Sequence, residues 1–297
     1  MSSTNVAKVR NSRNSTELDE REPFGSRLTA AMSARGPLCV GVDPHPELLR
    51  AWGLADDVAG LRAFARTCVD ALAGEVAVLK PQSAFFECHG AQGIEVLEEF
   101  IGAASDAGAL VLADVKRGDI GSTMTAYARA YLADGAPLAV DAVTLSPYLG
   151  FDALTPAIEL ARRTGRGVFV LAATSNPEGA SVQRAHNDGR AVDQSIVDAA
   201  AACNAGARPF GDVGVVVGAT IGRGRLRLDG LNGPILAPGF GAQGATTSDL
   251  RAVFGGVPRL VLPTSSRDVL RHGPNPMALR DAALHARDVI AADVSAW

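Results

Sequence analysis

The sequence predicts a single (β/α)8 barrel, an α/β fold, and two observations carry that prediction. Eight short apolar runs rich in β-forming residues alternate with Ala- and Leu-rich stretches of helical period. The runs are continuously apolar, which is typical of parallel strands buried on both faces. A doubly wound open sheet would also fit the alternation, but eight strands in a chain of 297 residues favour the closed barrel, which usually needs about 250 residues.

The expected elements follow one another regularly along the chain. The predicted strands cover residues 38–42, 76–80, 109–114, 141–145, 167–172, 213–217, 234–237 and 259–262. Most intervening stretches have apolar residues every three or four positions, as a helix with one buried face does. Helices are therefore expected at about 57–73, 91–106, 120–133, 152–163, 188–205 and 275–292. The polar segment 174–189 is long for a connection in such a fold, so it is either a surface insertion or a loop over the mouth of the barrel.

Residues 1–22 are polar and carry charges of both signs. They offer few anchors for a core, so we expect a flexible N-terminal tail before one barrel domain at residues 23–297. The tail has no apolar segment of the kind a secretory signal contains. No stretch of the chain approaches the roughly 20 consecutive apolar residues of a membrane span. A cytoplasmic location without membrane contact is therefore expected.

The composition argues against several kinds of partner. The chain has 28 basic and 32 acidic residues, giving a net charge of −4, and only 5% aromatic residues. It therefore lacks both the positive footprint and the stacking platforms of a nucleic-acid-binding protein. The four cysteines are widely spaced without a C-x-x-C pair, and the histidines form no H-E-x-x-H motif. Free thiols are thus expected, with neither a zinc site nor a disulfide framework.

Polar side chains gather where the predicted strands end. Asp43 follows the first strand, Lys80 ends the second, and Ser175 follows the fifth. The densest group is the segment 113–123, ADVKRGDIGST, at the end of the third strand. Because the carboxyl ends of barrel strands meet at the face where barrel enzymes have their active sites, we expect these groups to lie together.

The segment 113–123 places two carboxylates and an ammonium group in close order. If the strand stays extended, Asp114 and Lys116 point to the same side, and Asp119 lies near the start of a helix. One interpretation is a salt-bridged strand end with Asp119 as a helix cap. Lys80 on the neighbouring strand favours a functional interpretation, because it completes an alternating row of two acids and two lysines.

The charges in this row indicate the chemistry. A lysine that forms a Schiff base needs a lowered pKa, whereas carboxylates near Lys116 favour its ammonium form and the role of a general acid. A nearby cation such as Lys80 favours the neutral form of Lys116 instead, and the sequence leaves open which of the two effects on the pKa of Lys116 is larger. A carboxylate fixed beside a substrate carboxylate repels it, and loss of neutral CO2 relieves that repulsion while an ammonium group protonates the carbanion. Decarboxylation without a cofactor therefore suits this constellation.

The segments after the last two strands resemble a phosphate site. The glycines of GFGAQGA allow backbone N–H groups to approach an anion, although turns would explain them equally well. Arg267 supplies a fork of donors, and Ser265 and Ser266 supply hydroxyl groups. Barrel enzymes often bind phosphate at this place.

These segments resemble the orotidine 5′-phosphate decarboxylase family, and in particular its longer-chain bacterial branch. The signature Asp-x-Lys-x-x-Asp-Ile-x-x-Thr is intact within VLADVKRGDIGSTM. Further similar segments follow in family order over about residues 39–270: CVGVDPHPELL, VLKPQSAFFECHG, VTLSPYLGFD, ATSNPEGASVQ, APGFGAQGAT and SSRDVL. The resemblance implies conversion of orotidine 5′-phosphate to UMP and CO2 in de novo pyrimidine biosynthesis, without a metal or an organic cofactor.

The resemblance also implies roles for single residues in catalysis. Lys116 would protonate C6 of the pyrimidine, Asp114 would lie beside the substrate carboxylate, and Lys80 would bridge toward Asp114 and the ribose. The active unit would be a homodimer with shared sites. Three residues would be contributed to the partner's site: Asp119, Ile120 and Thr123.

The remaining implied roles concern substrate binding. Asp43 would face the ribose hydroxyls, and Ser175 would lie at the edge of the pyrimidine. Gln243 would reach from the phosphate toward the base. Arg267 and Pro238 would line the phosphate end.

Two other functions fit parts of the pattern. Related barrels that act on sugar phosphates, namely 3-keto-gulonate-phosphate decarboxylase and hexulose-phosphate synthase, share the Asp-x-Lys-x-x-Asp core. They bind a divalent metal through a carboxylate near the end of the second strand, where this chain has Lys80. A barrel that binds a nucleotide without converting it, as a sensor or scaffold, is the other alternative, and the intact row of four charges argues against it.

Overall fold

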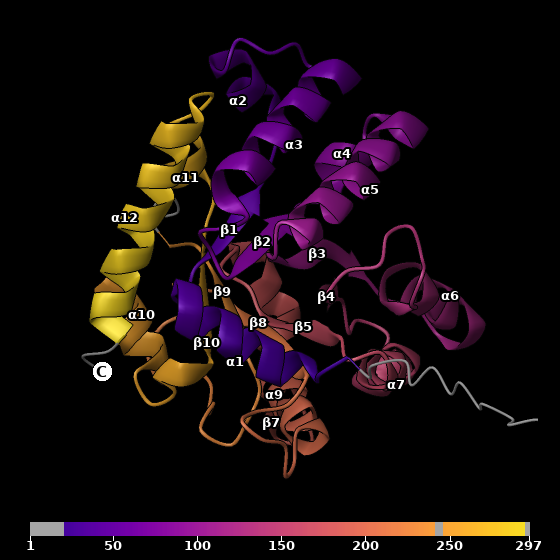
Figure 1. Ribbon diagram of the computed structural model, residues 1–297. Helices are drawn as coiled ribbons and strands as arrows, with labels where there is room; N and C mark the ends of the chain where they lie inside the picture. Colours follow the sequence, from indigo (N-terminus) through magenta and orange to yellow (C-terminus); the bar gives the residue numbers. More distant parts are fainter. Residues whose placement is uncertain (1–20, 241–245, 295–297) are drawn as a thin grey trace, which may run out of the picture.

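A computed structural model describes residues 21–240 and 246–294. Eight parallel strands close into a barrel in the order β1-β10-β9-β8-β5-β4-β3-β2 (Figure 1). They are β1 (Cys39–Val42), β2 (Val78–Pro81), β3 (Leu110–Arg117), β4 (Ala142–Leu145), β5 (Gly167–Ala173), β8 (Val213–Val217), β9 (Ile235–Pro238) and β10 (Val261–Ser265). The predicted (β/α)8 fold is confirmed, and every predicted strand overlaps an observed one.

Helices surround the barrel and follow the strands in chain order (Figure 1). The longer ones are α1 (Phe24–Arg35), α3 (Val58–Leu72), α5 (Gly90–Asp106), α6 (Gly121–Leu132), α7 (Thr155–Arg163), α9 (Val192–Cys203), α10 (Thr247–Phe254) and α12 (Pro276–Val294). The short ones are α2 (Pro46–Ala51), α4 (Ala84–Glu87), α8 (Ala180–Gln183) and α11 (Arg267–Leu270). Three 3-10 turns complete the set: η1 (Phe151–Leu154), η2 (Pro177–Gly179) and η3 (Pro258–Leu260). The sequence pattern does not predict α1, α2, α4, α8, α10 or α11.

The core has two layers. The larger layer lies between the strands and the surrounding helices, and the smaller one fills the inside of the barrel. Helix α1 contributes to the inner layer, where the ring of Phe24 meets the edge of Phe169 with centroids 6.0 Å apart. Packing on both faces explains why the strands are apolar throughout.

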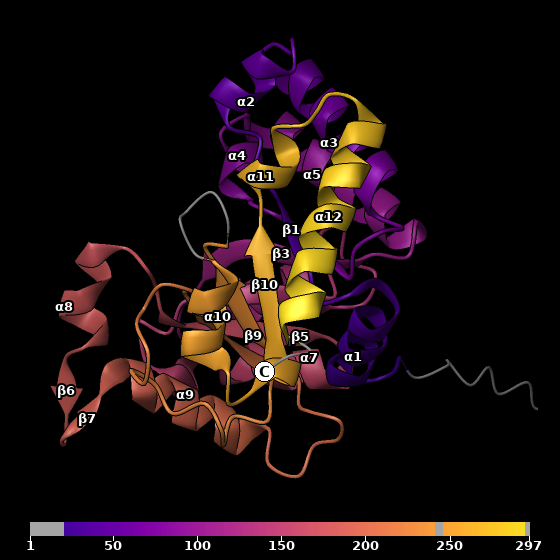
Figure 2. The same cartoon turned by 90° about the vertical axis from the view of Figure 1, so that its left-hand side faces the viewer.

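The segment after β5 forms a small projection rather than an open loop. It contains η2, α8 and an antiparallel pair, β6 (His186–Asn187) and β7 (Arg190–Ala191), which extends away from the barrel wall (Figure 2). Asp188 and Gly189 form the turn between them, both with positive φ angles as tight hairpins require. The helix predicted from about residue 188 therefore begins later, at Val192, because residues 186–191 form this hairpin.

The predicted tail at residues 1–22 lies, except for Arg21 and Glu22, outside the described residues. The four cysteines are free, as expected, and burial raises the pKa of Cys39 to about 12. Over residues 21–240 and 246–294, none of the helices combines the length and the apolar character needed to cross a membrane.

Candidate active site

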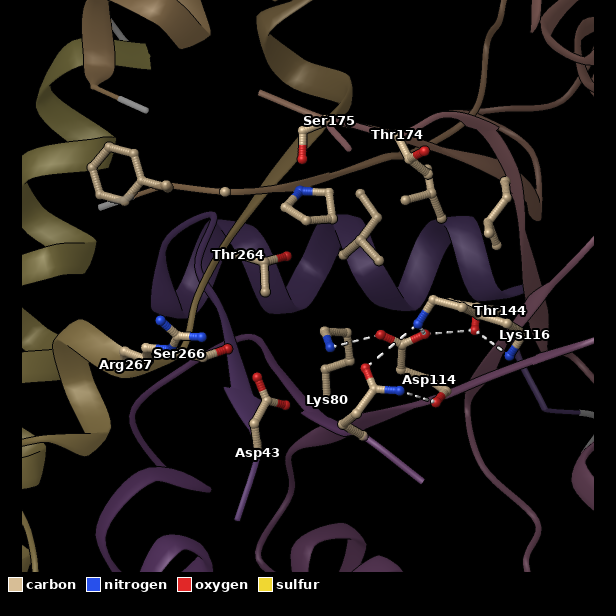
Figure 3. Close-up of a pocket in the computed structure, with 18 of the residues that line it drawn as sticks. Asp43, Lys80, Asp114, Lys116, Thr144, Thr174, Ser175, Thr264, Ser266 and Arg267 are labelled. Atoms are coloured by element: carbon tan, nitrogen blue, oxygen red, sulfur yellow. Dashed lines mark hydrogen bonds and ion pairs between the residues drawn. The ribbon is translucent and has the colours of Figure 1, made fainter. Parts of the chain in front are cut away.

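A cavity of about 280 Å³ opens at the carboxyl ends of the barrel strands. Figure 3 shows Thr144 and Asp114 on one side of it, Arg267 on the other, and Lys80 and Asp43 between them. Six barrel strands (β1, β2, β3, β4, β5 and β10), or the residues directly after them, thus supply its charged and hydroxyl groups. The predicted site residues that line the cavity are Asp43, Lys80, Asp114, Lys116, Ser175, Pro238 and Arg267.

Asp114 is the centre of the charged row. Its Oδ2 accepts a hydrogen bond from Lys80 Nζ at 2.9 Å, and its Oδ1 accepts one from Lys116 Nζ at 2.5 Å. Thr144 Oγ1 donates a third, to Oδ1, at 2.9 Å. Gln82 lies beside the row, with its Nε2 3.1 Å from the carbonyl oxygen of Asp114 and its Oε1 3.4 Å from Lys116 Nζ. The carboxylate is thereby fixed on both of its oxygens.

The charges around Asp114 and Lys80 determine the protonation of these two groups. Burial alone would raise the pKa of the Asp114 carboxyl group, but the ammonium groups of Lys80 and Lys116 outweigh this effect and hold the pKa well below its usual range. Burial would likewise lower the pKa of Lys80, yet the carboxylates of Asp114 and Asp43 outweigh it and raise that pKa. Lys80 is only 5% exposed, so near neutral pH the cavity contains a buried, fully ionised pair.

Lys116 and Asp114 meet by a different geometry from the one predicted. The extended strand expected through this region is interrupted, because the pairing of β3 with β4 shifts register between Ala113 and Arg117. Lys116 has a φ of 47°, a left-handed conformation that is uncommon outside glycine. The side-chain contact is therefore made across a bulge in the strand rather than by regular alternation.

The middle of the cavity provides an unpaired acceptor. Asp43 Oδ1 is buried and has no hydrogen-bond partner among the described residues. A methyl group at Gly41 would lie 2.0 Å from Ser266 Oγ and 3.3 Å from Asp43 Oδ2. A side chain at that position of β1 would therefore displace the Ser266 hydroxyl group from its place in the cavity wall. This part of the cavity can accept hydrogen bonds from ligand hydroxyl groups.

The far end of the cavity is open to an anion. Arg267 is exposed at the start of α11, and its guanidinium makes no ion pair within residues 21–240 and 246–294. Ser266, Gly239 and Phe240 line the same end, whereas Ser265 is buried and does not line it. Gln243, predicted to reach toward a base, lies outside the described residues.

Ser175 lies on the opposite wall, after β5. Two hydrogen bonds join its neighbour Thr174 to Gln183 of α8. The backbone N–H of Thr174 donates to Gln183 Oε1 at 3.0 Å, and Gln183 Nε2 donates to Thr174 Oγ1 at 2.6 Å. The part of the segment at 174–183 is thereby tied to the cavity wall, whereas the β6–β7 pair extends away from it (Figure 2).

Three predicted site residues do not line the cavity of this chain. Asp119, Ile120 and Thr123 lie at the start of α6, where Ile120 is 62% exposed and Thr123 is exposed. Asp119 Oδ1 accepts from the N–H of Ile120, and the N-cap position of α6 is Ile120 without a side-chain cap. Asp119 is thus not a helix cap, which was the alternative interpretation from the sequence.

The structure adds residues that the sequence did not single out. Gln82 follows β2, Thr144 belongs to β4, and both contact Asp114. His45 also lines the cavity and packs against Phe85 with ring centroids 4.3 Å apart. A polar residue near the end of the apolar run DAVTL was the available signal for Thr144.

Comparison with known proteins gives a consistent picture. An orotidine 5′-phosphate decarboxylase of Salinispora tropica is 62% identical over 263 residues, 88% of this chain and 95% of that protein. One of Streptomyces coelicolor is 60% identical with the same coverage. A crystal structure from Streptomyces avermitilis, assigned to the same enzyme, has a TM-score of 0.90 and 58% identity, and covers 92% of this chain and 96% of that one.

More distant structures share the barrel. Leishmania donovani OMP decarboxylase has a TM-score of 0.71 at 28% identity, covering 92% of this chain and 99% of that one. The sequence profile described as "Orotidine 5'-phosphate decarboxylase / HUMPS family" matches residues 36–278, most of the chain. The resemblance expected from the sequence is confirmed: this chain belongs to the orotidine 5′-phosphate decarboxylase / HUMPS family.

Proposed function

We propose that this protein is an enzyme that decarboxylates orotidine 5′-phosphate to UMP and CO2 in pyrimidine biosynthesis, with no metal or organic cofactor. The observation that carries the proposal is the Asp114 carboxylate, held ionised between Lys80 and Lys116 inside the cavity. The names of the relatives that are 57–62% identical support the substrate.

The charged row supplies the steps of the reaction. Asp114 lies beside the substrate carboxylate and repels it. When the bond between C6 and the carboxyl carbon breaks, CO2 leaves neutral and the electron pair stays on C6. Lys116 in its ammonium form stabilises that pair and then gives its proton to C6. The side chain of Lys116 is 45% exposed, so water can return the proton.

Binding energy comes from groups away from C6. Arg267 and Pro238 line the phosphate end. The family resemblance assigns the contact between the phosphate and the base to Gln243, which lies outside the described residues. Asp43, with its unpaired buried oxygen, accepts from the ribose hydroxyls, and Ser175 lies at the pyrimidine edge. Two acids and two lysines cancel in charge, so Arg267 gives the cavity a net positive charge for an anionic substrate.

A homodimer with shared sites completes the proposal. Asp119, Ile120 and Thr123 are presented to the site of the partner subunit. The exposure of Ile120, together with 79% exposure of Tyr148 and 54% of Leu149, supports an apolar surface that a second copy would cover. Nucleic acid has no part in the proposal, since the chain is mildly acidic.

The proposal also includes the organisation and location of the chain. The barrel domain begins at about residue 23 after a polar tail, and the enzyme works in the cytoplasm. Four free cysteines, two of them buried, support a reducing compartment.

One assay tests the function against its alternatives. Purified protein is incubated with orotidine 5′-phosphate in EDTA, and the loss of substrate absorbance is followed together with CO2 release. Turnover that resists EDTA is expected. Stimulation by magnesium would instead favour the metal-dependent sugar-phosphate barrels, which the ammonium group of Lys80 at the end of β2 argues against. Binding of UMP without CO2 release would favour a sensor.

A further inference from the structure

We propose that Thr144 is a positioning residue of the reaction, which fixes Asp114 and the backbone of Lys116 in one geometry through a single hydroxyl group. The inference deepens the proposed function and rests on it. Thr144 does not act on the substrate itself. It sets where the repelling carboxylate and the proton donor stand relative to each other.

The bulge in β3 creates the need for such a residue. Ala113 pairs with Val143 and Arg117 pairs with Leu145, so β3 advances four residues while β4 advances two. Asp114, Val115 and Lys116 therefore all lie opposite Thr144. The N–H groups of residues in such a bulge lose their regular strand partners. A buried N–H without an acceptor would be costly.

The hydroxyl group of Thr144 replaces the missing strand acceptor. Its Oγ1 accepts from the N–H of Val115 and from the N–H of Lys116, each at 3.0 Å. It also lies 2.9 Å from Asp114 Oδ1. A hydroxyl group has two lone pairs and one hydrogen. Because both lone pairs are occupied, the hydrogen must point to Asp114, and the carboxylate must accept it.

This arrangement couples the two groups that carry the chemistry. Lys116 has the left-handed φ of 47°, a conformation that persists only where surrounding contacts hold it. The bond from its N–H to Thr144 is one such contact, and Lys116 Nζ then reaches the same Oδ1 of Asp114 that Thr144 contacts. When the ammonium group gives up its proton, Thr144 and Lys80 still hold the two carboxylate oxygens.

Burial makes the hydroxyl group hard to replace by water. Thr144 is 1% exposed although it lines the cavity. Its shape is matched by valine, which removes the hydroxyl group and keeps the volume. Serine keeps the hydroxyl group and removes a methyl group. The two substitutions therefore separate hydrogen bonding from packing.

The test compares Thr144→Val and Thr144→Ser with the wild type on orotidine 5′-phosphate, and measures UMP binding by calorimetry. We expect Thr144→Val to lower kcat by about 10- to 100-fold, the usual effect of a lost hydrogen bond to a charged group, while KM and UMP affinity change less than about threefold. Thr144→Ser should recover kcat to within about fivefold of the wild type. Thr67→Val removes a hydroxyl group that donates to Ala63 O within α3, away from the cavity. It is the control and should leave kcat unchanged.

The outcomes are decisive in either direction. A folded Thr144→Val enzyme with kcat within twofold of the wild type would overturn the inference, and so would a serine variant as impaired as the valine variant. If Thr144→Val does not fold, Thr144→Cys replaces it, because a thiol is a weak donor and acceptor; the same loss of kcat is expected, and near-normal kcat would overturn the inference. A wild type without turnover would contradict the proposed function instead.

Discussion

The ion pair between Lys80 and Asp114 gives the sharpest energetic prediction. Lys80→Met keeps most of the side-chain volume and removes the charge. The atoms Lys80 Nζ and Asp114 Oδ2 are 2.9 Å apart, and the side chains are 6% and 10% exposed. At an effective dielectric constant near 20, their attraction is about 6 kcal/mol before the cost of desolvation.

The net loss of stability is smaller than that attraction. Breaking a buried pair by removing one partner usually lowers the free energy of unfolding by about 3–5 kcal/mol. Asp114 keeps Lys116 and Thr144 as partners, so we expect the lower end of that range, about 3 kcal/mol. Urea unfolding at pH 7 measures it, with turnover of orotidine 5′-phosphate recorded on the same samples. Turnover should be lost under conditions where the variant is still folded.

Two further variants separate catalysis from stability. Arg225→Met breaks an ion pair with buried Asp193, in which Asp193 Oδ2 lies 2.7 Å from Arg225 Nη2. Neither residue lines the cavity. The free energy of unfolding should therefore fall, whereas kcat should stay unchanged. The double variant Lys80→Met/Asp114→Leu should regain most of the lost stability, since replacing both partners by apolar groups is often neutral, but none of the activity. A Lys80→Met protein that unfolds at the wild-type urea concentration, or a double variant that converts substrate, would refute the reasoning.

Three other predictions concern the remaining parts of the site. Lys116→Ala should abolish UMP formation and leave the circular dichroism spectrum unchanged, because this side chain is half exposed. When these subunits are mixed and re-equilibrated with Asp119→Ala subunits, about a quarter of wild-type activity should return, since half of the dimers are hybrids and each hybrid has one intact site of two. No return of activity after proven subunit exchange would contradict a shared site. Arg267→Ala should raise KM for orotidine 5′-phosphate by about 10- to 100-fold and leave the slower turnover of orotidine, which has no phosphate, nearly unchanged; equal effects on both would argue against a phosphate contact. The difference in stability between the wild type and Lys80→Met/Asp114→Leu should depend on pH. The lowered pKa of Asp114 contributes stability to the wild type above the unfolded value near 3.9, and this is lost as pH falls through the folded value; the raised pKa of Lys80 contributes stability below about 10.4, and this is lost as pH rises through its folded value. A difference that is constant from pH 2 to pH 11 would exclude that linkage.

The barrel itself was predictable because its signal is repeated. Eight apolar runs of similar length need only be counted, and parallel strands buried on both faces leave no alternation to confuse the count. Lys80 and Asp43 could be assigned to one site for the same reason, since strand ends in a barrel converge. The barrel and its site could be predicted because the alternation of strands and helices repeats along the chain, so no single side chain decides the result.

Local backbone conformation explains most of what the sequence did not reveal. The bulge around Lys116 depends on pairing between β3 and β4, which are separate in sequence, and Thr144 in the run DAVTL is equally compatible with a buried strand residue that only packs. The hairpin at β6 and β7 did leave a signal, the Asp188-Gly189 turn, but it is too short for a periodic pattern. Helix α1 was overlooked although Phe24, Leu28 and Ala31, which are buried, have helical spacing, because it precedes the first strand and so falls outside the alternation.

The position of Asp114 is paradoxical if the cavity is considered only as a binding site. An ionised carboxylate weakens the binding of a carboxylate substrate, and a neutral side chain would bind it better. The two lysines keep Asp114 ionised, and Thr144 holds it in place, so the repulsion is not relieved by protonation or by movement. Under the proposed function, the phosphate contact with Arg267 at the far end supplies the binding energy that holds the substrate carboxylate against Asp114. Removing CO2 ends the repulsion while the phosphate contact persists, so the same arrangement that weakens the ground state favours the transition state.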